Sequence, residues 1–382
     1  MACARDKSNG KGKGKGSLGL EVQLKYRLND HGDLGRVILF GVVVTVASLA
    51  AAPVSYSVKK LPLPGANGLV TLDYFAYDPA SGRVWVPAGN IGSVDVIDAK
   101  TDAITSVEGF TVASVELKGK QRQLGPSSVA VGDGVVYTGN RADSTVCIID
   151  AKALKKGDCI TFAPVSAGMA AAPDGLIYIA STKELWGTSG APPLGISAAE
   201  PGLKIFSASD PKHLVPAGRI PLPGSAEGYA EDRHHGLFYT NLEESGQTVA
   251  IDTRAHKIVS TWKSCEDPSG VAVDAKRGLV FVACTDHVIV LDTRHGGQKV
   301  GSIQVGAGID NIDYSEEAGL LYAAASDAAV LVVVKVGNDP AKPEMVATIP
   351  TVKGARSVIA GANGRAYLID PYGGAILKVE PK

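Results

Sequence analysis

The sequence predicts an all-β protein, a seven-bladed β-propeller with four-stranded antiparallel blades. The main observation is a glycine followed by an aromatic or β-branched strand, which recurs seven times at intervals of 52, 41, 61, 42, 41 and 45 residues. Four short strands in each unit of about 40 residues are typical of propellers. The seven segments are GRVWVPA (82–88), GVVYTGN (134–140), GLIYIAS (175–181), GLFYTNL (236–242), GLVFVAC (278–284), GLLYAAA (319–325) and GRAYLID (364–370).

Each recurring segment is expected to be the second strand of its blade. A small apolar strand such as PSGVAVDA (268–275) precedes it, and a strand ending in Asp such as TVAIDTR (248–254) follows it. A fourth strand such as KVGSIQV (299–305) completes the unit. The last unit stops at AILKVEP (375–381), so the N-terminal YSVKKLPLPG (56–65) is expected to complete its blade. This strand would close the ring and cover an open sheet edge, giving a single domain over 55–382.

Several repeat segments contain a shared core. This core is YTN at 239–241 and YTGN at 137–140. The segment TVAIDTR (248–254) follows the first of these, and the similar VDVIDAKT (94–101) lies in an earlier repeat. In these motifs the chain resembles the YVTN-repeat β-propeller family over roughly residues 55–382. The resemblance implies an exported scaffold, because the repeat residues are structural and specify the fold much more strongly than a function.

The first 52 residues read as a polar preamble and a signal peptide. Residues 1–36 include the basic run KGKGKG (11–16), then comes the apolar VILFGVVVTVA (37–47), and SLAAAP (48–53) supplies small residues. A basic flank, a short apolar stretch and a small-residue end are the features of a secretory signal. The alternative is a membrane anchor, although spanning needs about 20 apolar residues. We expect an exported protein, periplasmic or extracellular, that meets a membrane only through an uncleaved leader.

Net charge is −1 over 382 residues, with 38 Lys and Arg against 39 Asp and Glu. The leader is basic, so the expected propeller is mildly acidic, which argues against a nucleic-acid partner. The charged residues Lys118, Lys120, Arg122, Arg141 and Lys183 lie in predicted loops near Trp186. Together with Trp186 as a stacking surface, these charges, Arg122 among them, would suit an anionic ligand or single-stranded nucleic acid. The other interpretation is a solvated rim.

Four cysteines remain beyond the leader. Cys265 and Cys284 fall on neighbouring segments of one predicted blade. Cys147 and Cys159 fall on two successive outer strands of another predicted blade. We predict the disulfides Cys265–Cys284 and Cys147–Cys159, which suit an oxidising compartment. Zinc binding fits less well because neither pair has a histidine at ligand spacing.

The predicted first strands bring one residue per blade to the mouth of the central channel. Carboxylates converging on the axis suit a cation, an amine or a polyol. The alternative is an ion network in which Arg356 pairs with Asp310 or Glu227. Two long connections, 114–126 and 183–202, border the same face, which we call the loop-rich face, and the short turns lie on the opposite turn face. The mouth residues are Asp73, Ser127, Ala167, Glu227, Ser269, Asp310 and Arg356, with Tyr74 and Asn311 one position further along.

The leading functional hypothesis is a non-catalytic, monomeric scaffold that binds a protein or small molecule on the loop-rich face. One alternative is a lactonase-like hydrolase in which Glu227, Asp310 and Asp73 hold Ca²⁺ or Mg²⁺, assisted by His287 or Arg356. Another is a structural module of the cell envelope. The sequence contains no Gly-x-Ser-x-Gly, phosphate-loop, dinucleotide-binding or haem-attachment motif, so no cofactor other than a divalent cation is expected.

Overall fold

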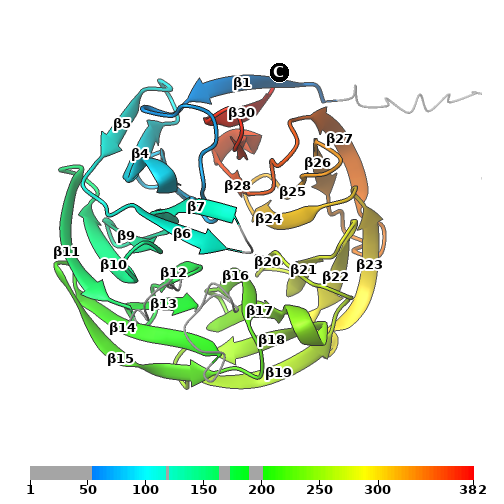
Figure 1. The fold of residues 1–382 in the computed structure, drawn as a ribbon. Coiled ribbons are helices and arrows are strands. Elements are labelled where there is room, and N and C mark those ends of the chain that lie inside the picture. Colours follow the sequence, from blue (N-terminus) through cyan, green and yellow to red (C-terminus); the bar gives the residue numbers. More distant parts are fainter. Residues whose placement is uncertain (1–53, 118–119, 163–172, 189–200) are drawn as a thin grey trace, which may run out of the picture. The chain divides into compact units, whose positions relative to one another are not determined.

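The structure is a computed structural model that describes residues 54–117, 120–162, 173–188 and 201–382. The predicted leader, residues 1–52, lies outside the described residues. The chain from Ala52 to Lys382 forms one compact unit. Within it, seven four-stranded antiparallel sheets surround a central axis (Figure 1), so the predicted seven-bladed β-propeller is confirmed.

The strands of each blade run outward from the axis in chain order, except in the last blade. Blade 1 contains β2 (Ala76–Asp78), β3 (Arg83–Ala88), β4 (Ser93–Asp98) and β5 (Ile104–Val107). Blade 2 contains β8 (Pro126–Gly132), β9 (Val135–Asn140), β10 (Thr145–Asp150) and β11 (Lys155–Thr161). Blade 3 contains β12 (Leu176–Ile179), β13 (Glu184–Thr188), β14 (Gly202–Asp210) and β15 (His213–Pro221). Blades 4 and 5 contain β16 (Ala226–Asp232), β17 (Leu237–Leu242), β18 (Gln247–Asp252) and β19 (Lys257–Lys263); and β20 (Val271–Asp274), β21 (Leu279–Ala283), β22 (His287–Asp292) and β23 (Gln298–Gln304). Blade 6 contains β24 (Ile309–Ser315), β25 (Leu320–Ala325), β26 (Val330–Lys335) and β27 (Glu344–Pro350).

Blade 7 combines both ends of the described chain. It contains β28 (Val358–Ala360), β29 (Ala366–Asp370), β30 (Ala375–Pro381) and, as its outermost strand, β1 (Tyr56–Pro62). The pairing runs antiparallel from Tyr56 opposite Pro381 to Pro62 opposite Ala375. The predicted closure of the ring by the N-terminal strand is therefore confirmed.

The second strand of each blade carries a buried aromatic side chain that packs between neighbouring sheets. In the strand pairing, each aromatic residue lies opposite an apolar residue of the innermost strand, as Tyr239 lies opposite Ala230. The one exception is Tyr322, which lies opposite Asp313. Such pairs fill the space between blades and supply much of the core. The seven aromatic residues are Trp85, Tyr137, Trp186, Tyr239, Phe281, Tyr322 and Tyr367.

Blade 3 differs from the prediction. GLIYIAS (175–181) forms β12, the innermost strand, and the second strand is β13, which carries Trp186. The Trp186 side chain is fully buried, packs edge-on against Phe238, and donates from Nε1 to Glu184 at 3.0 Å. The prediction of Trp186 as a loop residue offering a stacking surface was wrong, because its indole is the inter-blade aromatic of blade 3.

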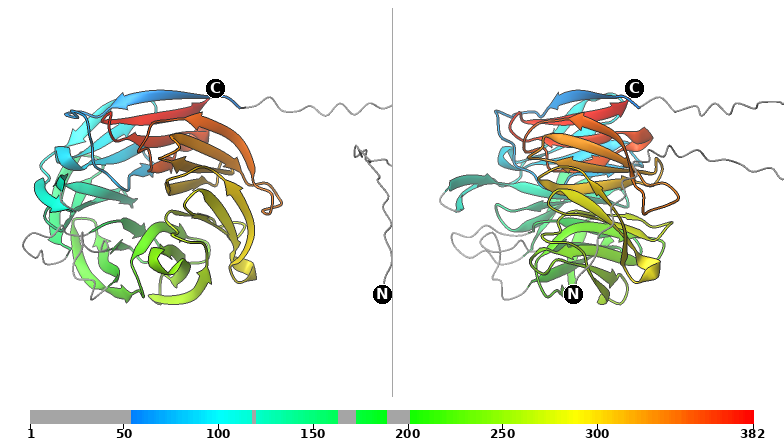
Figure 2. Two further views of the ribbon diagram at one scale, coloured as in Figure 1. Left: turned by 45° about the vertical axis from the view of Figure 1, so that its right-hand side comes forward. Right: turned by 90° about the vertical axis from the view of Figure 1, so that its right-hand side faces the viewer.

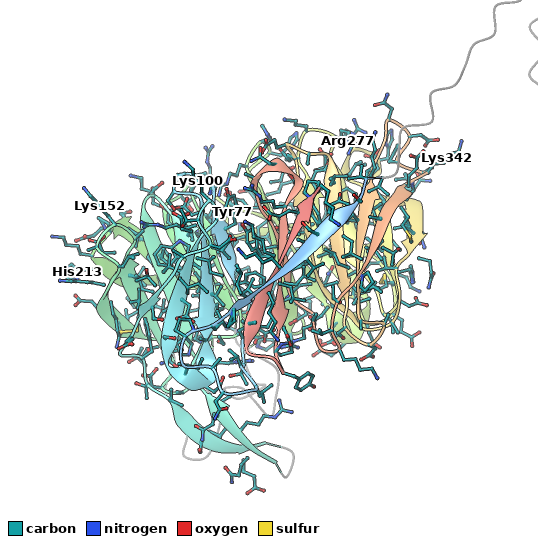
Figure 3. The ribbon with its side chains drawn as sticks, turned by 90° about the horizontal axis from the view of Figure 1, so that it is seen from above. Tyr77, Lys100, Lys152, His213, Arg277 and Lys342 are labelled. Atoms are coloured by element: carbon teal, nitrogen blue, oxygen red, sulfur yellow. A yellow bond between two sulfur atoms is a disulfide. The ribbon has the colours of Figure 1, made fainter. Side chains whose placement is uncertain are left out.

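The two long connections also differ from simple loops. Part of 114–126 forms a hairpin of β6 (Ala113–Leu117) and β7 (Lys120–Leu124), which projects from one face and extends towards the axis (Figures 1 and 2). Of the second connection, 184–188 is β13, and 189–200 lie outside the described residues. Figure 3 shows Lys100, Lys152 and Arg277 along the turn face, opposite the projecting hairpin.

Short 3₁₀ helices are the only helices among the described residues: η1 (Gly89–Ile91), η2 (Glu243–Ser245), η3 (Thr293–His295) and η4 (Ala362–Gly364). None of the helices in this part of the chain has the length and apolar character needed to cross a membrane.

Both predicted disulfides are present. Cys147 and Cys159 are directly opposed residues of β10 and β11. The Cys265–Cys284 bond ties the segment before β20 to the end of β21, with the two Cα atoms 6.1 Å apart. Two disulfides indicate an oxidising environment.

Candidate functional site

Backbone hydrogen bonds between innermost strands bring the mouth residues together. The amide of Asp73 donates to the carbonyl of Ser127 at 2.9 Å, and the amide of Gly270 donates to the carbonyl of Asp310 at 2.7 Å. The strands approach so closely that a Cβ atom on Gly270 would lie 2.5 Å from the Asp310 carbonyl oxygen. Glycine at this position is therefore a steric requirement. These contacts hold the start of one innermost strand against the start of the next, Asp73 against Ser127 and Gly270 against Asp310.

Five of the converging side chains form a continuous chain of ion pairs. The Arg356 guanidinium donates to the carboxylates of Asp310 at 2.9 Å and Asp73 at 2.8 Å. Arg141 extends the chain by pairing with Asp73 at 3.4 Å and with Asp174. The pairing of Arg356 with Asp310, expected as the alternative to a metal site, is confirmed, whereas the partner on its other side is Asp73 rather than Glu227.

The sequence analysis did not predict two residues of this series of ion pairs, Asp174 and Arg141. The prediction placed Ala167 at the mouth of blade 3, and that residue lies outside the described residues. Asp174 occupies the position because β12 is the innermost strand of its blade. The signal was the strand-like KELWGT (183–188), which provides the true second strand. Arg141 follows β9 and was considered only as a loop charge.

Tyr74 crosses the channel axis. It comes from blade 1, yet its hydroxyl donates to Glu227 Oε1 of blade 4 at 3.0 Å. Its ring lies 4.8 Å from the ring of Tyr229, measured between centroids, and the Tyr229 hydroxyl shares a 2.6 Å hydrogen bond with Thr188. The corresponding residue is small in the other six blades: Ser128, Gly175, Gly228, Gly270, Asn311 and Ser357.

The mouth is acidic and poorly solvated. Four carboxylates and two guanidiniums leave it with a formal charge of −2 when all are ionised. Burial, together with the nearby Asp174 and Asp310 carboxylates, raises the pKa of Glu227 well above its ordinary value. Burial also raises the pKa of Asp174 and of Asp310. The neighbouring Asp73 carboxylate raises the pKa of Arg356. Burial therefore favours the neutral form of these carboxyls over the ionised form, most strongly at Glu227.

Two cavities meet at this level. A cavity of about 660 Å³ on the loop-rich face is lined by Asp73, Arg141 and Arg356, by Arg122 of the hairpin, and by Tyr372. A second cavity of about 500 Å³ follows the channel and is lined by Asp73, Tyr74, Tyr229 and Asn311. Asp73 lines both cavities, whereas Tyr74 lines only the channel cavity. The prediction that Asn311 and Tyr74 lie by the channel is thus supported by their positions.

The structure brings His287 to a different place. It begins β22, and its Nδ1 lies 2.8 Å from Asp286 Oδ1, while neither cavity is lined by it. The proposed metal ligands Glu227, Asp310 and Asp73 are occupied by Tyr74 and Arg356. In the described parts of the chain, no three Asp, Glu, His or Cys side chains are grouped closely enough to hold a metal ion.

Comparison with known proteins gives the fold. No protein-family model matches the chain, and no curated protein matches it. Among solved structures, a chain of Kuenenia stuttgartiensis hydrazine synthase is similar with a TM-score of 0.63 and 13% sequence identity, covering 83% of this chain and 98% of that chain.

A chain from the crystal structure of a mitotic checkpoint complex is similar with a TM-score of 0.62 and 12% identity, covering 90% of this chain and 99% of that chain. At such low identity the likeness extends to the fold alone. By its own strand order and by these neighbours, the chain is a seven-bladed β-propeller.

Proposed function

We propose that this protein is an exported binding scaffold of the YVTN-repeat type, which holds a small molecule at the channel mouth on its loop-rich face. The observation that carries the proposal is the cavity of about 660 Å³ above the ion-paired mouth. Ligand sites are concave, partly apolar, and supplied with a few oriented polar groups. The disulfides and the predicted leader support export.

Rigid positioning is what the fold contributes to binding. The floor is built on innermost strands joined by backbone hydrogen bonds, and each guanidinium is fixed by two carboxylates. One wall is the β6–β7 hairpin, whose Leu124 packs on Val115 and Ala142. The rim is apolar, since Leu69 and Tyr372 line the cavity and are 52% and 66% exposed. A preorganised floor lowers the entropic cost of binding.

The test is a thermal-shift panel of amines, polyols, carboxylates, Ca²⁺ and Mg²⁺ on the purified protein. A ligand present at a hundred times its Kd adds about 2.7 kcal/mol to the unfolding free energy. We expect at least one class to stabilise the protein, and to do so less when 113–124 are replaced by a short Gly-Ser linker. Lys152→Ala, on the opposite turn face (Figure 3) and outside both cavities, is the control and should leave the shift unchanged. Equal stabilisation of the hairpin replacement would contradict the proposed site.

The divalent-cation-dependent hydrolase stays a prediction. For a cation to use Asp73 and Asp310, it would have to displace the Arg356 guanidinium that lies between them. Hydrolysis of a lactone and ester panel, measured with added Ca²⁺ or Mg²⁺ and again with a chelator, tests this alternative. Turnover that depends on the cation and falls in Asp310→Asn would favour the enzyme over the scaffold.

A further inference from the structure

We infer that the mouth recognises an organic cation, a ligand carrying an ammonium or guanidinium group, through the Glu227 carboxylate and the rings of Tyr74 and Tyr229. This inference rests on the proposed function and names the class of ligand. It depends on three separate observations at one place: an unneutralised carboxylate, a pair of aromatic rings, and a tyrosine found where the other blades have small residues.

Glu227 differs from the other mouth carboxylates in its counter-ion. Asp310, Asp73 and Asp174 each contact the guanidinium of Arg356 or Arg141. Among the described residues, Glu227 is paired with no Lys, Arg or His, and its side chain receives the Tyr74 hydroxyl instead. An ionised carboxylate in a partly buried position without a counter-ion is costly. A bound cation would supply the missing charge.

Aromatic rings complete a surface for such a ligand. Tyr74 and Tyr229 lie tilted to each other with centroids 4.8 Å apart, beside the same carboxylate. The faces of aromatic rings attract ammonium and guanidinium groups, with a contribution of about 0.5–2 kcal/mol. Tyr74 and Tyr229 line the channel cavity of about 500 Å³, and Glu227, which accepts the Tyr74 hydroxyl beside them, is partly exposed, so a ligand in the channel can reach the cluster. A carboxylate beside two rings favours an organic cation over a hydrated metal ion.

Tyr74 is the residue that makes the arrangement possible. At the same position the other blades have Ser, Gly or Asn, none of which spans the channel. From blade 1, Tyr74 reaches Glu227 in blade 4, and so joins opposite sides of the ring. Its backbone is held in place by pairing with blade 2, where the amide of Val129 donates to the Tyr74 carbonyl at 2.9 Å.

The experiment compares n-butylammonium with butyrate, which has a similar apolar body and the opposite charge, and with Ca²⁺. Binding to the full protein is measured by titration calorimetry. We expect n-butylammonium to bind and butyrate not to bind. Glu227→Gln should weaken the amine at least tenfold, which is about 1.4 kcal/mol. Asp339→Asn, at an exposed carboxylate that lines neither cavity, is the control and should bind like the wild type.

Two tyrosine variants test the role of the ring. Tyr74→Phe keeps the ring and removes the hydroxyl that competes for Glu227, so it should bind the amine at least as tightly as the wild type. Tyr74→Leu should weaken binding several-fold. Glu227→Gln keeps the size of the side chain and an oxygen that can accept the Tyr74 hydroxyl, so this variant should fold. The melting temperature of each variant checks this point.

Outcomes separate this inference from the proposed function. No amine binding, or amine binding that Glu227→Gln leaves unchanged, overturns the inference. Calcium binding that requires Glu227 in the absence of amine binding also overturns it, and indicates an inorganic-cation site. If another class of ligand binds and needs the β6–β7 hairpin, the proposed function stands while the organic-cation inference fails.

Discussion

Asp313 gives the sharpest prediction about stability. It lies on β24 between blades 6 and 7, and its Oδ2 accepts a hydrogen bond from the Ala360 amide of β28 at 2.7 Å. The Tyr314 amide donates to its Oδ1 at 2.8 Å. Burial raises the pKa of Asp313 from 3.8 to about 6. The corresponding residue in the other blades is Ala or Ile: Ala76, Ala130, Ile177, Ala230, Ala272 and Ile359.

The perturbation is Asp313→Asn, which removes the ionisation and keeps an oxygen for Ala360. Because the pKa of Asp313 is raised in the folded state, proton binding stabilises the fold. That contribution is fully present below pH 3.8 and is lost as the pH rises through about 6. Each pKa unit corresponds to about 1.4 kcal/mol, which gives about 3 kcal/mol in all. Because a part is already lost at pH 4, the wild type should lose about 2.4 kcal/mol relative to the variant between pH 4 and 7.

The assay is urea or thermal unfolding at half-unit pH steps from 4 to 7.5. At about 2.1 cal/mol/K per residue over roughly 330 residues, about 2.4 kcal/mol shifts the melting temperature by about 3.5 °C. The difference between variant and wild type isolates Asp313 from other buried carboxyls such as Glu227. Asp339→Asn, at an exposed carboxylate, is the control and should give a flat difference. If the difference in unfolding free energy between Asp313→Asn and the wild type does not change with pH, the reasoning is refuted, whatever the size of that constant difference.

Two further predictions concern the ring. Replacing Cys147 and Cys159 together with Ser should reduce the unfolding free energy by about 3 kcal/mol, because their bond closes a short loop with a sequence separation of 12; chemical denaturation under non-reducing conditions measures this, and an unchanged midpoint would contradict it. Trp186→Ala should cost about 3–5 kcal/mol, since the side chain is fully buried. A cost below about 0.5 kcal/mol, typical of an exposed loop residue, would show that Trp186 is not in the core.

Much of the fold could be read from the repeat. The strands of six blades, the closing strand 56–62 and both disulfides follow from local patterns, because each repeat places the same residue types at the same turns and faces. Blade 3 was misread because two successive strands there, β12 and β13, both resemble a second strand. Only the pairing of Ile177 with Trp186 shows which of them lies inside.

The candidate site could be read only in part. Glu227, Asp310, Asp73 and Arg356 were placed at the mouth from strand alignment alone. The role of Tyr74 was not predicted, because its contact with Glu227 joins blades separated by 153 residues in the sequence. The same is true of Arg141, which pairs with Asp73 across 68 residues.

By itself, then, the sequence determined the number of blades, the closing strand and, outside blade 3, the residues at the start of each innermost strand. Repetition is a local property, so it survives in a linear chain. The tertiary structure alone decided which mouth charges neutralise one another, that Glu227 is left with a tyrosine, and that Tyr74 lies across the channel. Those outcomes depend on distances across the ring, and these exist only once the seven blades have closed.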